Sequence, residues 1–363
     1  MLDGDGFGEF DRFLCSTDEF FEAAEEENLH ANRLGNGWHK RIVTRGWMLC
    51  YREDEHTETA MKILVTGSTG LVGAALVRAL AREGHTVCRL VRPESVVKGE
   101  TKEGFDVAWN PITGELGEAA VGADAVVNLA GASIAGGRWT EKRKGLLRSS
   151  RVETTRALVN ALVKMNARPS VLVSASAIGY YGNRGEEVLT EESAAGTDFL
   201  ASLTQDWEAE ALKAEALGIR VVLARFGIIL ARQGGALPQM MMPFYVFAGG
   251  RVGSGRQWMS WVSLEDVVAI LRIALANGAV RGAVNVVVPQ PVRNAEFTRA
   301  LAGAMHRPAL FPAPAFALRL ALGELADVLL GSQRVMPKRL EHLGYRFLDT
   351  ALPDALHTVL TKV

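Results

Sequence analysis

The chain has 363 residues, of which 48% are hydrophobic and 22% charged, and its 37 glycines exceed the usual share. This balance excludes collagen, coiled coils and wholesale disorder, and no apolar run reaches the roughly 18 residues that indicate a membrane span. The three cysteines lack metal-type spacing and the seven histidines form no close cluster. We therefore expect reduced thiols, no metal site and a cytoplasmic location.

Charge is distributed unevenly along the chain. Residues 1–60 hold 14 acidic and 6 basic side chains, and the remainder holds 27 acidic and 34 basic ones. The acidic first residues do not have the pattern of a signal peptide. The mild positive charge of the remainder suits an anionic small ligand better than a nucleic-acid surface.

Residues 1–60 show no alternation of strands and helices. We predict an appended acidic segment, either loosely ordered or the product of a start site assigned too far upstream. The alternative is a small helical cap, because one amphipathic helix is possible where Phe20 and Phe21 precede the acidic run Glu25, Glu26 and Glu27.

Strands and helices alternate regularly from Met61 onward. Short apolar runs predict strands over 63–65, 85–91, 123–129, 171–173 and 219–223. Helical periodicity predicts helices over 71–81, 140–165 and 204–217. This order predicts an α/β fold, a doubly wound parallel sheet covered on both faces, over residues 61–235.

The pattern loosens after residue 235. We predict a short strand over 258–262, a helix over 264–276 and a late strand over 283–288, and then mostly helix interrupted by prolines. Residues 236–363 are therefore expected to form a smaller, mostly helical substrate lobe, with its late strands contributing to the sheet.

A glycine-rich turn gives the strongest functional signal. Gly67, Gly70 and Gly73 have the spacing G-x-x-G-x-x-G, directly after one predicted strand and at the start of a helix. Such glycines permit a tight turn, approach of backbone to a pyrophosphate, and close helix–strand packing. The alternative is a turn without a ligand. The predicted cofactor-binding residues of this turn are Gly67, Thr69, Gly70, Leu71, Val72 and Gly73.

The end of the second strand selects the cofactor. An acidic residue there would bind a ribose 2′-hydroxyl and favour NAD, but the sequence has Arg92 and no carboxylate before Glu94. Arg92 can pair with a 2′-phosphate in a bidentate way. We therefore predict NADP(H) over NAD(H), with an exposed surface arginine as the alternative.

Several further strings resemble the extended short-chain dehydrogenase/reductases. The matching stretches are Asn128-Leu129-Ala130-Gly131, Ser174-Ala175-Ser176, Tyr180-Tyr181-Gly182, Arg225 and Asp266. Others resemble the atypical epimerase-like subfamily, often labelled sugar nucleotide epimerase, which has its own C-terminal domain of unassigned function. These are Arg138-Trp139-Thr140, Gly253-Ser254-Gly255-Arg256-Gln257, Pro291-Val292-Arg293-Asn294 and Pro337-Lys338-Arg339-Leu340.

The resemblance covers residues 61 to about 360 and implies a bound NADP(H) and a small substrate. It adds Leu129, Ala130, Gly131 and Phe226 to the predicted cofactor-binding residues. Many similar proteins pair through helices such as 140–165 and 199–217, so a homodimer is compatible with the resemblance.

One departure from the family pattern concerns the proton-transfer pair. Short-chain dehydrogenases use a Tyr and a Lys four residues later, whereas Phe199 and Leu203 occupy the matching positions. Ser176 keeps the place of the catalytic serine. Tyr180 and Tyr181 are candidate acids, with aromatic packing as the alternative for both. Glu208 is predicted to be a surface charge or a support behind the site.

Candidate substrate-binding residues follow in the second half. Arg138, Arg256 and Trp258 suggest a lobe that grips an anion and stacks on a ring. Arg225 could join them, but the alternative is that it braces the end of the sheet. Asp266 is predicted to cap the helix that begins near Leu264.

Two functions of different class are consistent with these residues. The first is an NADP(H)-binding oxidoreductase or epimerase acting on a small substrate, for which a nucleotide-linked compound is one candidate. The second is a cofactor-binding regulatory protein without turnover, suggested by Phe199 and Leu203. No nucleic-acid motif or membrane-binding segment is evident.

Overall fold

The computed structural model describes residues 14–16, 38–44, 47–52, 60–97, 99–101 and 103–361. The chain divides into two compact units, Met1–Ala60 and Met61–Val363. The first unit contains a three-stranded antiparallel sheet in the order β1-β3-β2. Its strands are β1 (Leu14–Ser16), β2 (Trp38–Thr44) and β3 (Trp47–Arg52). The sequence pattern did not predict these strands, and the helix expected near residues 20–27 lies outside the described residues.

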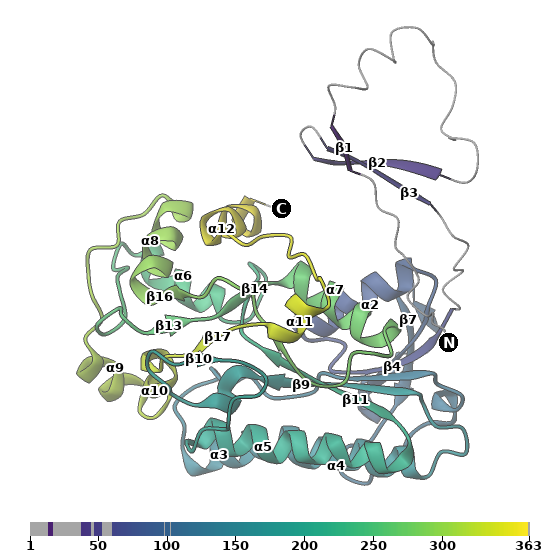
Figure 1. Ribbon diagram of the computed structural model, residues 1–363. Helices are drawn as coiled ribbons and strands as arrows, with labels where there is room; N and C mark the ends of the chain where they lie inside the picture. The colour runs from purple at the N-terminus through teal and green to yellow at the C-terminus, as the bar shows by residue number, and fades with distance from the viewer. Residues whose placement is uncertain are drawn as a thin grey trace, which may run out of the picture. The chain divides into compact units, whose positions relative to one another are not determined.

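The second unit is built on an eight-stranded sheet in the order β15-β11-β9-β8-β4-β5-β7-β6, drawn in Figure 1. Seven strands are parallel, and only the edge strand β6 runs antiparallel. The chain moves from β4 outward in one direction and then returns to β8 to build the other half. The strand order therefore reverses between β4 and β8, which is where ligands bind in such sheets. The strands are β4 (Lys62–Thr66), β5 (Thr86–Val91), β6 (Glu100–Thr101), β7 (Gly104–Ala108), β8 (Ala125–Asn128), β9 (Val171–Ala177), β11 (Arg220–Phe226) and β15 (Gly282–Val286).

Helices cover both faces of this sheet, as predicted. In Figure 1, α2 (Leu71–Arg82) and α7 (Leu264–Ala276) lie on one side, and α3 (Glu141–Arg148), α4 (Thr154–Val163) and α5 (Phe199–Leu212) lie on the other. Alternate residues of each strand point to opposite faces. Ile63 and Val65 thus pack with α2 and α7, whereas Leu64 packs with α4.

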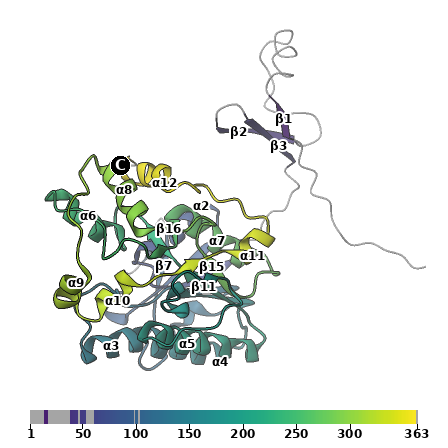
Figure 2. The same ribbon diagram turned by 60° about the vertical axis from the view of Figure 1, so that its left-hand side comes forward.

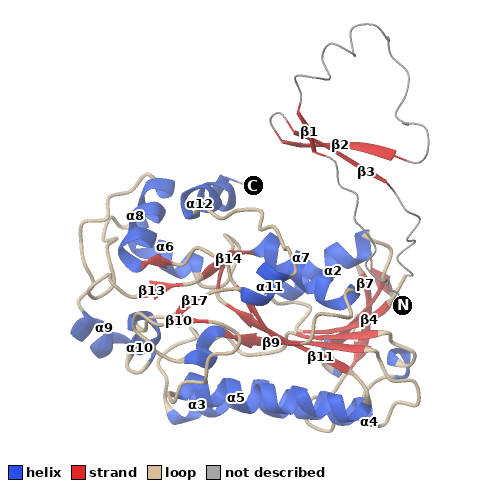
Figure 3. Ribbon diagram, in the orientation of Figure 1, coloured by secondary structure: helices blue, strands red, loops and turns tan. Residues whose placement is uncertain are grey.

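The C-terminal part adds a mostly helical lobe, most of which Figures 2 and 3 show beyond one end of the sheet, whereas its helix 338–342 lies beside the sheet next to β15. Its helices are α6 (Leu237–Tyr245), α8 (Asn294–Met305), α9 (Ala315–Leu322), α10 (Leu325–Leu330), α11 (Lys338–His342) and α12 (Leu352–Thr361). Short strand pairs connect it to the sheet domain: β12 (Ile228–Leu230) with β14 (Trp261–Ser263), β13 (Trp258–Met259) with β16 (Val292–Arg293), and β10 (Val188–Leu189) with β17 (Arg334–Val335). No helix among the described residues has the length and apolar character needed to cross a membrane.

One unpredicted strand and two predicted elements distinguish the structure from the expectation. The strand β7 was not predicted. The single helix expected over 140–165 is α3 and α4 joined by a π-helical turn, Ser149–Glu153. The strand expected over 258–262 is two short strands, because β13 pairs with β16 whereas β14 pairs with β12, and the buried Ser260 lies between them.

The cap of α7 also differs from the prediction. Ser263 is the N-cap, and its hydroxyl oxygen accepts the Asp266 backbone N–H at 3.1 Å. Asp266 is buried and accepts the Tyr345 hydroxyl at 2.7 Å. Asp266 therefore links α7 to the C-terminal segment, a contact 79 residues away in sequence that local spacing cannot predict.

Candidate functional site

The glycine turn has the geometry of a ligand cradle. Gly67 has φ of +66°, and a methyl group added to it would lie 2.6 Å from the Leu129 carbonyl oxygen. A methyl group on Gly73 would lie 2.1 Å from the Gly67 carbonyl oxygen. Both positions therefore admit only glycine without displacement of backbone. This packing brings the start of α2 directly against the turn.

The N-terminus of α2 is open. Gly70 is its N-cap, and no side chain in the described part of the chain caps it. The first hydrogen bond within the helix runs from the Ala74 N–H to the Gly70 carbonyl at 2.9 Å. The preceding amides, including those of Leu71 and Val72, are the orphan donors that bind an anion at a helix start. Thr69, within the turn, is exposed.

A buried polar group holds the neighbouring loop in place. The Thr66 hydroxyl donates to Asn128 Oδ1 at 2.8 Å and accepts the backbone N–H of Leu129 at 3.0 Å and of Ala130 at 3.2 Å. Asn128 Nδ2 donates to Thr155 at 2.8 Å. Leu129 and Ala130 are thereby fixed beside Gly67, with Gly131 following. Thr66 and Thr155 were not among the predicted site residues, because ordinary threonines in a strand and a helix give no local signal.

Arg92 directly follows β5. In the sheet, β5 pairs with β4, the strand that leads into the glycine turn. Arg92 is exposed, and no carboxylate among the described residues pairs with it. Glu94 follows in the short helical turn Pro93–Ser95. The guanidinium of Arg92 is thus available for an anion at this edge, or simply solvated.

Ser176 belongs to a buried network at the end of β9. Its hydroxyl donates to Glu208 Oε1 at 2.5 Å, and Glu208 forms a two-bond ion pair with Arg225 at 2.8 and 2.7 Å. Ser176, Glu208 and Arg225 are 2%, 6% and 4% exposed. Glu208 is therefore not a surface charge, and the structure matches the alternative prediction of a support behind the site. Arg225 braces the sheet end through this pair and is not open to a substrate anion.

Tyr181 completes the network. Its hydroxyl donates to Asn285 Oδ1 at 2.7 Å and accepts Arg225 Nη1 at 3.0 Å. The ring is fully buried, and burial raises the pKa of Tyr181 to about 12. This geometry matches the packing alternative for Tyr181.

Tyr180 is placed differently. Its ring lies against the Arg225 guanidinium, with 3.5 Å from the guanidinium carbon to the ring centroid, and meets Tyr181 edge-on. Its hydroxyl makes no hydrogen bond with the described residues. Between the two tyrosines, Tyr180 is thus the one whose hydroxyl is not already used by the protein.

Apolar packing fills the place of the lost proton-transfer pair. Phe199 meets Trp139 edge-to-face at 5.3 Å between ring centroids, and Leu203 is 2% exposed. Both belong to a cluster with Trp207 and Ala175. Phe226, at the end of β11, is partly buried against this cluster and against the core beside it.

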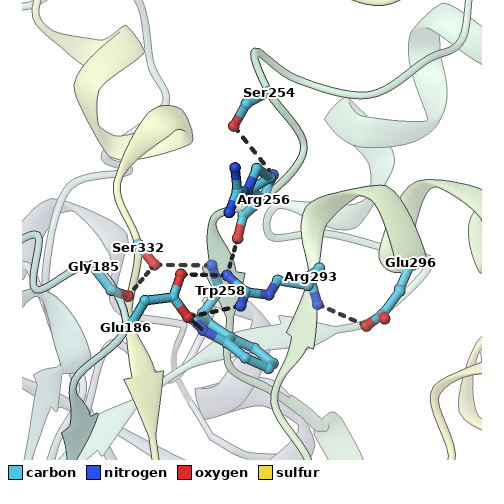
Figure 4. A network of polar contacts seen from close by, with 8 residues as sticks. All are labelled: Gly185, Glu186, Ser254, Arg256, Trp258, Arg293, Glu296 and Ser332. Atoms are coloured by element: carbon cyan, nitrogen blue, oxygen red, sulfur yellow. Dashed lines mark hydrogen bonds and ion pairs between the residues drawn. The ribbon is translucent and has the colours of Figure 1, made fainter.

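Figure 4 shows two of the candidate substrate residues, Arg256 and Trp258, with their polar neighbours. Arg293 forms a two-bond ion pair with Glu186 at 2.7 Å, and Trp258 Nε1 donates to Glu186 Oε2 at 3.0 Å. The hydrogen bonds from Arg293 and Trp258 lower the pKa of Glu186 to about 2. Arg293 and Arg334 also lie over the Trp258 ring, at 3.9 and 4.6 Å from its centroid. A substrate ring would have to displace a guanidinium to stack there.

Arg256 and Arg138 occupy different surroundings. Arg256 is exposed; its N–H donates to Ser254 Oγ at 3.2 Å and its carbonyl accepts Arg293. Arg138 is exposed and lies at the turn before α10, 3.5 Å from the place of a methyl group on Gly323. The structure thus joins Arg256 and Trp258 through Arg293, whereas Arg138 contacts another part of the lobe. Neither Glu186 nor Arg293 was predicted as a site residue.

The sheet order, the glycine cradle and the uncapped helix define an NAD(P)-binding Rossmann protein of the short-chain dehydrogenase/reductase type. Residues 63–287 match the model of the NAD dependent epimerase/dehydratase family, and residues 313–359 match a domain of unknown function, DUF1731. The chain therefore belongs to the NAD dependent epimerase/dehydratase family.

Relatives and solved structures agree with this assignment. The chain is 44% identical to epimerase family protein Mb2239 of Mycobacterium bovis over 83% of this chain and 98% of the relative. It is 40% identical to epimerase family protein YfhF of Bacillus subtilis over 83% of this chain and 98% of that protein. A crystal structure of human epimerase family protein SDR39U1 with NADPH matches with a TM-score of 0.73 and 31% identity, covering 84% of this chain and all of that one.

Proposed function

We propose that this protein is an NADP(H)-dependent oxidoreductase or epimerase acting on a small substrate, with nucleotide-linked compounds as the first candidates. The observation that carries the proposal is the cradle formed by Gly67, Gly73 and the open start of α2. Arg92 supports NADP(H) over NAD(H), since it lies where a 2′-phosphate would be bound. The NADPH in the similar human protein's crystal structure supports the same choice.

The residues present fit a dinucleotide. The turn 67–73 and the fixed loop 129–131 would hold its diphosphate, and Arg92 its 2′-phosphate. When bound, the nicotinamide supplies the hydride donor or acceptor. The chain must then move only a proton, as in other short-chain dehydrogenases.

Ser176 and Glu208 are proposed to move that proton. During oxidation of a substrate alcohol, Ser176 Oγ accepts the hydroxyl proton and passes its own proton to Glu208 Oε1, to which it already donates at 2.5 Å. The reverse path returns the proton. Arg225 holds the Glu208 carboxylate in place before the transfer, and Glu208 becomes a neutral carboxylic acid beside Arg225 until the proton returns. Tyr180, with its hydroxyl unpaired by the described residues, is the remaining candidate acid.

The test is a screen of alcohol, ketone and nucleotide-sugar substrates with product analysis. Product analysis is needed because an epimerase that keeps its cofactor bound gives no net absorbance change. Ser176→Ala should lower turnover about 10²–10⁴-fold while leaving NADPH affinity unchanged. Tyr180→Phe should leave turnover unchanged unless Tyr180 is the acid. Equal turnover by Ser176→Ala and wild type would overturn the proposed role of Ser176.

A second candidate function is a cofactor-binding regulator without turnover. The apolar packing of Phe199 and Leu203 favours it, because neither side chain exchanges protons. Cofactor binding with no product from any substrate would support this candidate. A homodimer through α3, α4 and α5 remains a prediction, which the mass of the protein in solution would test.

A further inference from the structure

A buried arginine borders the cofactor cradle without a counter-ion. Arg151, on the π-helical turn between α3 and α4, is 9% exposed. Its guanidinium donates to the carbonyl oxygens of Ala132 at 2.9 Å and Leu147 at 3.3 Å. No carboxylate in the described part of the chain pairs with it. An isolated buried charge is costly, so such a group indicates an absent anionic partner.

The other arginines of the same helical segment show a contrast. Arg148 pairs with Asp206 of α5, and Arg156 pairs with Glu210 of α5. Arg151 meets no carboxylate of α5 but lies over its Trp207 ring, 5.4 Å from the centroid, and donates to the loop after β8. Arg143 also donates to that loop, at the carbonyl of Ser133. Arg143 Nε is buried and has no partner among the described residues. Burial, and after it the charge of Arg143, lowers the pKa of Arg151 to about 10.

The position of Arg151 identifies the missing anion. A methyl group on Gly131 would lie 3.2 Å from its guanidinium carbon. Gly131 follows Leu129 and Ala130, the two residues against which Gly67 packs. Arg151 thus borders the loop that forms one wall of the cradle, while the open amides of α2 form another.

We propose that Arg151, assisted by Arg143, binds the diphosphate of the dinucleotide beside the loop that follows β8. The inference rests on the proposed function. A guanidinium matches a phosphate in bidentate geometry, and two N–H donors already held by carbonyls fix its orientation. The same chemistry would suit the diphosphate of a nucleotide-linked substrate, and the experiment separates the two sources.

The test titrates the full-length protein with NADPH, NADH and 2′-AMP. Arg151→Met should weaken NADPH and NADH by the same factor, at least about tenfold, because both carry the diphosphate. Binding of 2′-AMP, which lacks a diphosphate, should not change. Arg151→Lys keeps the charge and should lose less affinity. Arg148→Met, on the same helical segment, is the matched control and should bind both dinucleotides as wild type does.

Stability provides a second readout. Arg151→Met removes the hydrogen bonds to the Ala132 and Leu147 carbonyls and should lower the urea midpoint of the ligand-free protein modestly, whereas NADPH should raise the midpoint less in this variant than in the wild type. An equal rise with NADPH in the two proteins would assign Arg151 a purely structural role and overturn the inference. Wild-type affinity of Arg151→Met for NADPH and NADH would also overturn it. If that variant instead lost only the binding of UDP to the NADPH-saturated protein, the substrate diphosphate would be the ligand. Failure of the wild type to bind any dinucleotide would refute the proposed function itself.

Discussion

The polar groups at the carboxyl edge of the sheet differ between its two halves. In one half, the open half, they lack anionic partners in the described part of the chain; in the other, the closed half, they bond to one another. Around β4, β5 and β8, the amides of α2, Arg92 and Arg151 have no anionic partner among the described residues. Around β9 and β11, Ser176, Glu208, Arg225 and Tyr181 satisfy one another in a closed buried network. One half therefore leaves its donors open to a ligand, whereas the other satisfies its polar groups within the protein, and the proposed proton transfer enters it only through Ser176. The contrast explains how cofactor binding can persist although Phe199 and Leu203 have replaced the usual proton-transfer pair.

The largest expected effect on stability comes from a substitution in the closed half. Glu208→Gln leaves Arg225 buried without its counter-ion and should lower the free energy of unfolding by about 3–5 kcal/mol. Urea denaturation measures this change. Glu208→Gln combined with Arg225→Met should recover much of the loss, because no buried charge remains. A loss below about 1 kcal/mol in the single variant would show that the network is not closed to water.

A smaller effect on stability is expected from a substitution in the open half. Gly73→Ala places a methyl group 2.1 Å from the Gly67 carbonyl and should cost about 2–3 kcal/mol of stability. It should also weaken NADPH and NADH together, since the turn must shift. Gly145→Ala in α3 is the control, because its methyl group meets nothing within 4 Å; it should stabilise the protein by up to about 1 kcal/mol. If the two variants had equal stability and equal cofactor affinity, the claim that the turn requires glycine at position 73 would be refuted.

Tyr180 and Tyr181 provide a matched test of which hydroxyl stabilises the closed half. Tyr181→Phe removes the hydroxyl that links Arg225 and Asn285 and should cost about 1–2 kcal/mol in thermal or urea unfolding. Tyr180→Phe removes a hydroxyl without a partner among the described residues and should change stability by less than about 0.5 kcal/mol. The reverse order would mean that Tyr180, not Tyr181, supports the network.

Local patterns predicted the open half well. The strand before Gly67, the glycine spacing and the helix after it are contiguous in sequence, so their physical roles are visible together. The parallel, doubly wound sheet followed from the alternation of apolar runs. The strand β7 was not predicted because Asp106 interrupts its short apolar pattern. The Asp106 carboxylate accepts a hydrogen bond from Arg89 of the adjacent β5 at 2.8 Å.

The closed half could not be predicted in the same way. Glu208 lies on a helix and Arg225 on a strand, and nothing local indicates that they pair. Trp258 suggested a stacking platform, but Arg293 and Arg334, 35 and more residues away, lie over its ring. Such partners are set by tertiary packing, which a single sequence does not reveal.

The most direct test of the open edge is calorimetric titration of the wild type and Arg92→Ala with NADPH and NADH. The account predicts that the wild type binds NADPH about 10–100-fold more tightly than NADH, and that Arg92→Ala binds both with the affinity that the wild type has for NADH. Equal affinities in the wild type would contradict the assignment of Arg92 to a 2′-phosphate. The absence of binding to either nucleotide would contradict the claim that this edge is a cofactor site.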